Sequence, residues 1–165
     1  MNPLLPLAFA LLASTARAET PGHGHAHAPA APHDHAALRA AAPDLREQVA
    51  FPPDLKEATL ANMREHLQTI QAITSYLADR QFDAAADLAE TRLGMTSLQR
   101  HDAHTVAQYM PEDMRQIGHG MHQAASRFAI IAKDAGVSGD TGAALRALAD
   151  VQSSCLACHA GYRLR

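Results

Sequence analysis

The sequence predicts an all-α protein, folded as an antiparallel four-helix bundle. Its apolar residues recur at steps of three and four along most of the chain, and no stretch shows the alternation of a β-strand. The hydrophobic content of 47% comes with only 4% aromatic residues and no Trp, so alanine and leucine must fill the core. Four stretches of helical period, joined by short loops and one longer one, fit a bundle.

The first two helices are expected between the proline pair at 52–53 and residue 98. Proline suits the first turn of a helix, so the first helix begins at this pair. Its inward stripe is expected to be Leu60, Met63, Leu67, Ile70, Thr74 and Leu77. The second helix starts near Phe82, and its end stays open because Gly94 could either stop it or lie inside it. Residues 101–110 fit the longer crossing loop.

The third and fourth helices carry clearer start signals. Pro111 followed by two acidic residues predicts the start of the third helix, and Gly136 is expected to end it. Its inward stripe is predicted to be Met114, Ile117, Met121, Ala125, Phe128, Ile131 and Ala135. The fourth helix is expected from about Ala143 to Tyr162. Its predicted inward residues are Leu145, Leu148, Val151, Cys155, Cys158 and His159.

The amino-terminal region predicts export. Residues 1–18 hold a short apolar run and end in Ala16-Arg17-Ala18, which is typical of a signal peptide cleaved after Ala18. The following residues, 19–50, are rich in His, Ala and Pro and are expected to form a flexible tail. The bundle domain is then 51–165, the location is the periplasm, and no membrane span is expected.

Charge and residue types limit the functional classes. The formal net charge is −3, and no basic patch stands out, so nucleic acid is not expected as a partner. We find no acid–base pair or nucleophile arrangement, so the chain is not expected to be an enzyme.

The eleven histidines fall into distinct groups. Five of them crowd the tail, where neutral imidazoles could bind Cu, Ni or Zn or could simply belong to a soluble spacer: His23, His25, His27, His33 and His35. Four others are expected to be surface or loop residues: His101, His104, His119 and His122.

Both cysteines of the chain occur in the sequence Cys155-Leu156-Ala157-Cys158-His159, which is the C-x-x-C-H pattern of c-type haem attachment. Residues three and four apart are neighbours on a helix, so two thiolates and an imidazole gather on one side. The thiols suit the two vinyl groups of haem, and the histidine suits its iron. A thioredoxin-like motif would need a βαβ setting, and a zinc site would need further ligands.

The stretch "CLACHAGYR", placed in the last helix of an exported four-helix bundle, resembles cytochrome c′ and the other class II c-type cytochromes. The resemblance covers Phe51 to Arg165. It implies one haem c, held covalently by Cys155 and Cys158, with His159 as the axial iron ligand. It also implies that Tyr162 packs near the haem and that Arg163 lies near the propionates or the proximal face. A homodimer is compatible with the resemblance.

The second axial position decides the expected function. In the family the early part of the first helix covers this face, and here that stretch is "LANMREHLQ". Met63 as a ligand would give a low-spin iron suited to electron transfer, although methionine often only fills core space. His66 is a rival ligand, Arg64 could reach a propionate, and Met114 and Met121 are less suitable because their helix packs elsewhere.

The sequence therefore predicts a periplasmic electron-transfer cytochrome that exchanges electrons with redox partner proteins. The alternative is a five-coordinate haem protein that binds NO or CO, and transition-metal binding by the tail is compatible with either.

Overall fold

The computed structural model describes residues 43–165, and this part of the chain is mostly helical, as predicted. The long helices are α2 (Pro53–Ala78), α3 (Phe82–Arg92), α5 (Glu112–Ser138) and α6 (Thr141–Gly161). The short elements are β1 (Glu47–Val49), the 3₁₀ turn η1 (Met95–Ser97), α4 (Ala103–Ala107) and β2 (Tyr162–Leu164). The predicted signal peptide and the tail up to residue 42 lie outside the described residues.

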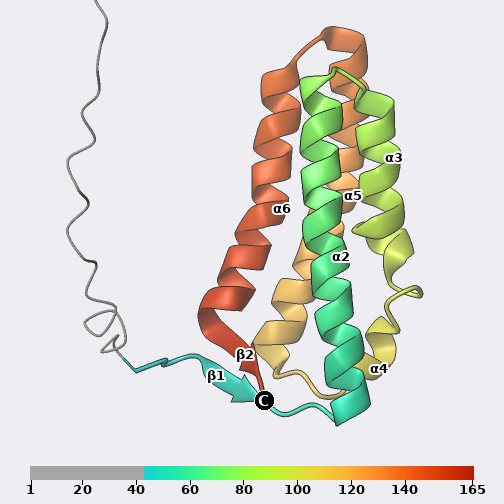
Figure 1. Ribbon diagram of the computed structural model, residues 1–165. Helices are drawn as coiled ribbons and strands as arrows, with labels where there is room; N and C mark the ends of the chain where they lie inside the picture. Colours follow the sequence, from blue (N-terminus) through green and yellow to red (C-terminus); the bar gives the residue numbers. More distant parts are fainter. Residues whose placement is uncertain (1–42) are drawn as a thin grey trace, which may run out of the picture. The chain divides into compact units, whose positions relative to one another are not determined.

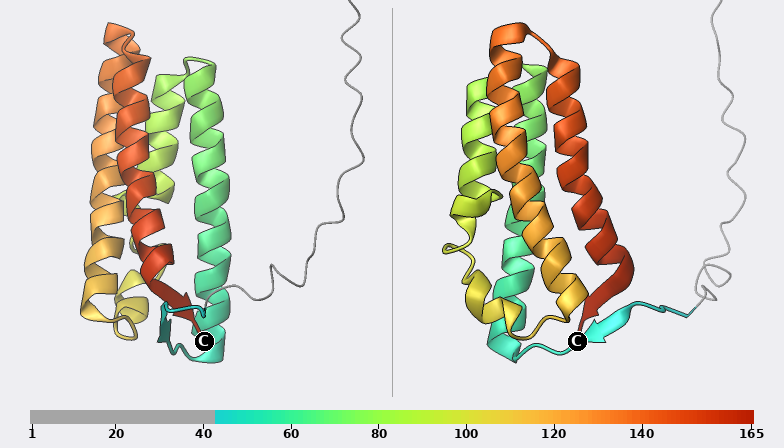
Figure 2. Two further views of the ribbon diagram at one scale, coloured as in Figure 1. Left: turned by 90° about the vertical axis from the view of Figure 1, so that its left-hand side faces the viewer. Right: turned by 180° about the vertical axis from the view of Figure 1, so that it is seen from behind.

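The four long helices lie side by side, and each runs opposite to the one before it (Figures 1 and 2). α5 packs most closely on α6 and α3, and α2 packs on α3, whereas α2 and α6 contact each other little. Long helices that follow one another in the sequence are therefore the main packing partners. Within residues 43–165, no helix is long and apolar enough to cross a membrane.

Proline, aspartate and glycine define the helix ends. Pro53 occupies the first turn of α2, and the Asp140 side chain accepts a hydrogen bond from the Ala143 backbone N–H (2.9 Å) at the start of α6. α5 ends at Ser138 and is capped by Gly139, whose φ of 80° lies in the left-handed region. The predicted end at Gly136 is wrong, because this glycine lies inside α5 and faces Phe82 of α3.

The second helix begins at Phe82 as predicted, whereas the sequence leaves its end open and the loop after it differs in part from the prediction. α3 ends at Arg92, before Gly94, and the chain then forms η1. The segment expected to be a crossing loop contains the short helix α4. Here Val106 is buried, and this side chain anchors the loop to the domain.

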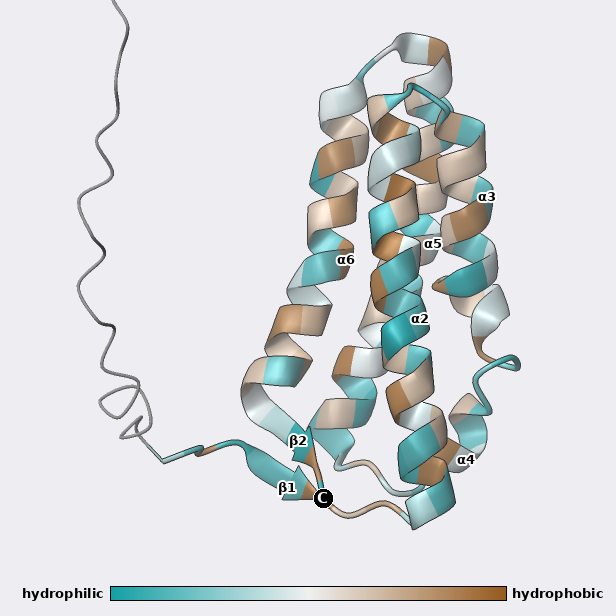
Figure 3. Ribbon diagram, viewed as in Figure 1, coloured by the Kyte–Doolittle hydropathy of each residue, from teal (hydrophilic) through white to brown (hydrophobic). Residues whose placement is uncertain are grey.

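The largest fully buried apolar side chains come from α2, α5, α6 and the residue that follows α3: Phe128, Ile73, Leu77, Val151 and Leu93. Small alanines fill the space between them, which allows the helix backbones to approach one another. Figure 3 shows brown and teal positions interspersed along each helix, as expected for helices with one buried face.

The predicted inward stripe of α2 is right for only half of its residues, and Leu60 is half-buried as expected. Leu77 is buried and Ile70 half-buried, but Thr74 is exposed, and Met63 and Leu67 are 37% and 72% exposed. The buried face is turned toward Thr59, Thr69, Ile73 and Leu77. A search for apolar residues alone misses this face, because two of its buried residues are threonines. Thr69 can be buried because its hydroxyl donates to the Glu65 carbonyl (2.8 Å).

On α6 the prediction is partly right. Leu148 and Val151 are buried as expected, and Cys155 and Cys158 are half-buried. Leu145 and His159 are exposed, so their expected inward orientation is wrong. α6 covers mainly α5, and this leaves a narrower buried face than a helix enclosed on both sides would have.

Residues 43–50 belong to the folded domain, contrary to the predicted boundary at residue 51 and the expected absence of strands. β1 pairs in parallel with β2, with Glu47 opposite Tyr162 and Val49 opposite Leu164. The Arg165 N–H extends this pairing by donating to the Val49 carbonyl (2.9 Å). The strands lie at the end of the domain where α2 begins and α6 ends (Figure 2).

Candidate functional site

The last turns of α6 carry the three residues of the C-x-x-C-H motif. Cys155 and Cys158 are both free thiols and are half-buried. His159 follows directly and is exposed. The helix therefore brings two thiols and an imidazole to one end of the domain, as their spacing predicts.

Two apolar clusters meet at this motif. The central cluster contains the buried side chains of the four long helices, and Cys155 packs against it. The terminal cluster consists of Val49, Phe51, Val106 and Met114, and Cys158 packs against it together with Tyr162 and Leu164. The two thiols thus lie between two separate apolar regions, an environment suited to a large apolar group.

Burial keeps both thiols in their protonated form. Burial raises the pKa of the Cys155 thiol, and it also raises the pKa of the Cys158 thiol, to which the neighbouring Cys155 adds a smaller effect. The thiolate is the form that reacts with oxidants and disulfides. A smaller thiolate fraction therefore slows the oxidation of the two cysteines.

His159 is accessible on its ring side and held on its backbone side. Its carbonyl accepts a hydrogen bond from Nη1 of Arg46 (3.5 Å), a residue just before β1. The imidazole is exposed to solvent and can meet a ligand without first losing a buried contact.

Tyr162 and Arg163 lie in β2, immediately after the motif. Tyr162 packs in the terminal cluster. Nε of Arg163 lies 3.3 Å from Oδ2 of Asp44, which is also paired with Arg46 at 2.8 Å. The hydrogen bonds from Arg46 hold the pKa of Asp44 well below its usual range. Asp44 and Arg46 belong to the segment predicted to be a tail, so sequence reasoning did not include them in the site.

The candidate distal residues on α2 lie in different surroundings. Met63 is partly exposed, and it belongs to neither apolar cluster. Exposed apolar side chains also occur one turn later on α2, at Leu67, and on α6 at Leu156. His66 instead faces two other histidines.

His66, His101 and His122 form a cluster of three imidazoles. The ring centres of His66 and His101 are 5.0 Å apart, and those of His66 and His122 are 6.3 Å apart. His122 is buried inside α5, so its predicted surface or loop placement is wrong. His101 is buried but lies in the loop before α4, and His104 and His119 are exposed as expected. The helical spacing of 119 and 122 was visible in the sequence, but the three-way meeting depends on the fold.

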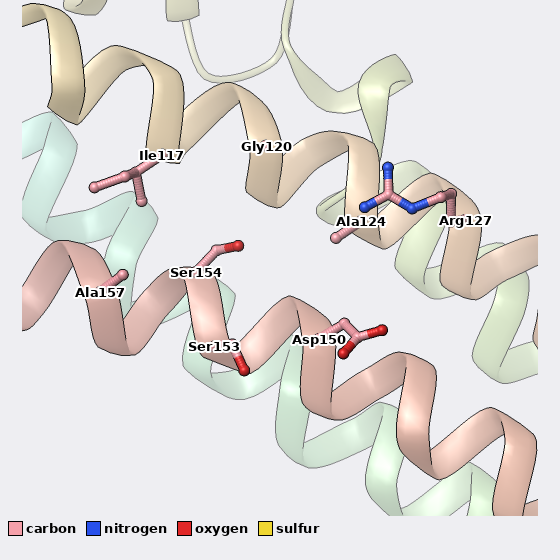
Figure 4. Close-up of a pocket in the computed structure, with 8 residues that line it drawn as sticks. All are labelled: Ile117, Gly120, Ala124, Arg127, Asp150, Ser153, Ser154 and Ala157. Atoms are coloured by element: carbon pink, nitrogen blue, oxygen red, sulfur yellow. The ribbon is translucent and has the colours of Figure 1, made fainter.

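A shallow groove of about 420 Å³ runs between α5 and α6 (Figure 4). Small side chains line most of it, and Arg127 and Asp150 face it from opposite helices. The two thiols and His159 are not among its lining residues, so the groove is distinct from the motif.

Comparison with known proteins adds no relative to this description. No protein-family model, no curated protein and no solved structure matches the chain.

Proposed function

We propose that this protein is an exported monohaem c-type cytochrome with an antiparallel four-helix bundle fold, and that it transfers electrons. The observation that carries the proposal is the C-x-x-C-H motif at the end of α6, where two free, half-buried thiols adjoin an exposed imidazole. Export rests on the character of residues 1–18, which lie outside the described residues.

The residues at the end of α6 fit a covalently held haem. Cys155 and Cys158 would hold it through two thioethers, and His159 would ligate its iron. Bound haem supplies an iron that stores and releases one electron by changing between its ferric and ferrous forms. The protein's share of the chemistry is to fix the group, shield it from water and leave it within reach of a partner.

The two apolar clusters provide the shielding. Cys155 adjoins the central cluster and Cys158 the terminal cluster, so a group attached to both thiols lies against apolar side chains at both ends. α2 and α6 make few contacts with each other, so a group attached to the thiols of α6 would displace little packing between these two helices. Apolar surroundings of this kind control solvent access and so tune the potential of an iron centre.

Met63 is the side chain we propose for the second iron position. Its sulfur belongs to neither apolar cluster, so filling core space does not account for it. His66 is less suitable, because its ring packs edge to face against His101 and lies near His122. Histidine and methionine ligation raises the potential and is suited to electron transfer.

Arg163 has a competing partner. The family resemblance implies a role near the propionates, but in this chain the guanidinium is paired with Asp44. A propionate would therefore compete with Asp44 for the Arg163 guanidinium, and Arg46 would still pair with Asp44 if Arg163 moved away. We therefore assign to Arg163 the positioning of the strand segment beside the motif.

Absorption spectra of the protein, purified from a host that attaches haem, test the electron-transfer proposal. The expected spectra are low-spin in both oxidation states and do not change when CO is added. Met63→Ala is expected to produce a high-spin spectrum that shifts with CO, because the sixth position becomes free. Met95→Ala changes a half-buried methionine on η1 and is the matched control, expected to leave the spectrum unchanged.

Two outcomes would count against the assignment. A high-spin, CO-responsive spectrum in the unmodified protein would favour the gas-binding alternative. A low-spin spectrum that survives Met63→Ala would remove Met63 from the iron and return His66 to consideration.

A further inference from the structure

The three histidines that meet between α2, α5 and the loop before α4 are not explained by haem attachment. They come from separate parts of the chain, and two of the three rings hydrogen-bond to a backbone carbonyl. Nδ1 of His122 bonds to the Leu93 carbonyl (2.7 Å), and Nε2 of His101 bonds to the Arg92 carbonyl (3.2 Å). Nε2 of His66 is buried and has no partner within the described part of the chain.

These hydrogen bonds define which ring nitrogens carry lone pairs. A carbonyl only accepts, so Nδ1 of His122 and Nε2 of His101 must be the protonated atoms. In the neutral rings, Nε2 of His122 and Nδ1 of His101 are then free to bind another group. Metal-binding histidines typically have this arrangement, in which the second ring nitrogen donates to a backbone carbonyl and fixes the tautomer.

Burial favours the neutral form of the His66 and His122 rings, and the neutral imidazole is the form that binds metals. Burial, and then the neighbouring His101 and His122, lower the pKa of His66 to about 4. Burial likewise lowers the pKa of His122, although its hydrogen bond to the Leu93 carbonyl opposes this. Glu65, next to His66 in the chain, is occupied by Arg92 and Arg100 and does not complete the set.

The spacing of one ring pair matches that of a metal site, and the spacing of a second pair is wider. Two imidazoles bound tetrahedrally to one ion, at the usual metal–nitrogen distance of about 2.0–2.1 Å, have ring centres roughly 5 Å apart. The observed separations from His66 are 5.0 and 6.3 Å. As the rings stand, no three ligand side chains within residues 43–165 enclose a metal position. His66 can turn without losing a hydrogen bond, because its Nε2 has none to lose.

We propose that His66, His101 and His122 bind one divalent late transition metal, such as Zn²⁺, after rotation of the His66 ring. Three neutral imidazoles suit Zn²⁺, Cu²⁺ and Ni²⁺, and a water molecule would fill the fourth position. The site is separate from the C-x-x-C-H motif and does not depend on the haem proposal.

Zinc binding to the full chain tests the site. Zn²⁺ is the probe because it is not redox-active, so it exchanges no electrons with haem or thiols. The parent for the experiment is the full-length protein in which the five histidines of the tail are replaced by Asn, with any free thiol alkylated. Binding is measured by isothermal titration and by zinc content after gel filtration.

The parent is expected to bind one equivalent of Zn²⁺. His66→Gln, His101→Gln and His122→Gln are each expected to weaken binding about tenfold or more, since each removes a ligand. The matched control is the His104→Gln/His119→Gln double variant, which changes two exposed histidines nearby and is expected to bind like the parent. Circular dichroism checks that each variant is folded, and His66→Gln breaks no hydrogen bond of the folded state.

The proposal fails if the parent takes up no stoichiometric zinc, or if the His66 variant binds zinc as well as the control variant does. Neither result bears on haem attachment, because the readout is zinc alone.

Discussion

At the scale of single residues, the environment of each side chain decides its chemistry. His66 is a base for which burial and two neighbouring imidazoles disfavour the charged form, so its pKa is about 4, below the usual 6.5. The thiols of Cys155 and Cys158 are shifted the other way for the same reason, since burial disfavours their anions. The spacing of the two cysteines was enough to predict that their thiols share one side of a helix. The histidine cluster around His66 depends on contacts between segments that are distant in the sequence.

The shift at His66 predicts a loss of stability in mild acid. Well above pH 6.5 the ring is neutral in both the folded and the unfolded chain and has no effect on stability. Between pH 6.5 and 4, the unfolded chain binds a proton that the folded chain does not, so the free energy of unfolding falls. The contribution at pH 5 is about 2 kcal/mol.

Urea unfolding at pH 7 and pH 5, in the presence of EDTA, measures this effect. The drop between the two pH values is expected to be smaller in His66→Gln than in the unmodified protein, while His122 maintains a residual pH dependence. An equal drop in both proteins would contradict the assigned pKa of His66.

At the scale of elements, the helix starts were predictable and several ends were not. Pro53 and Pro111 indicated where α2 and α5 begin, because proline favours the first turn. Gly136 looked like a helix end but lies inside α5, where a Cβ atom would come within 3.3 Å of Cβ of Phe82. Its small size therefore serves the packing of α5 on α3, which no local pattern reveals.

Gly118 inside α5 and Gly139 at its C-terminal cap are predicted to respond oppositely to substitution by alanine. Gly139→Ala places a side chain at φ 80°, which costs roughly 1–2 kcal/mol of stability. Gly118→Ala adds a methyl group in open space within a helix and is expected to gain about 0.5–1 kcal/mol. Urea unfolding of both variants gives the comparison, and equal effects would contradict the assigned helix end at Gly139.

At the scale of the whole domain, the segment before α2 determines how the motif is enclosed. β1 pairs with β2, the strand that follows the C-x-x-C-H sequence, and Arg46 donates a hydrogen bond to the His159 carbonyl. Val49 and Phe51 are buried with Val106 and Met114 beside Cys158. The all-α class was predictable from composition and period, but this long-range pairing was not, because three-residue strands leave no clear alternation.

Val49→Asp is predicted to destabilise the domain by at least about 2 kcal/mol, since it places a carboxylate in an apolar cluster. Leu45→Asp is the matched control. Leu45 is 89% exposed, so its replacement should change the free energy of unfolding by no more than about 0.5 kcal/mol. A Val49 variant as stable as the control would show that residues 43–50 contribute nothing to the folded domain.

The mass of the fully denatured protein tests the central claim most directly. The chain, produced in a host that attaches haem and then unfolded in acid, is expected to retain the mass of one haem, because two thioethers survive denaturation. The double variant Cys155→Ala/Cys158→Ala should have the mass of the polypeptide alone. If the unmodified protein also has only the mass of its polypeptide, covalent haem attachment to α6 is contradicted.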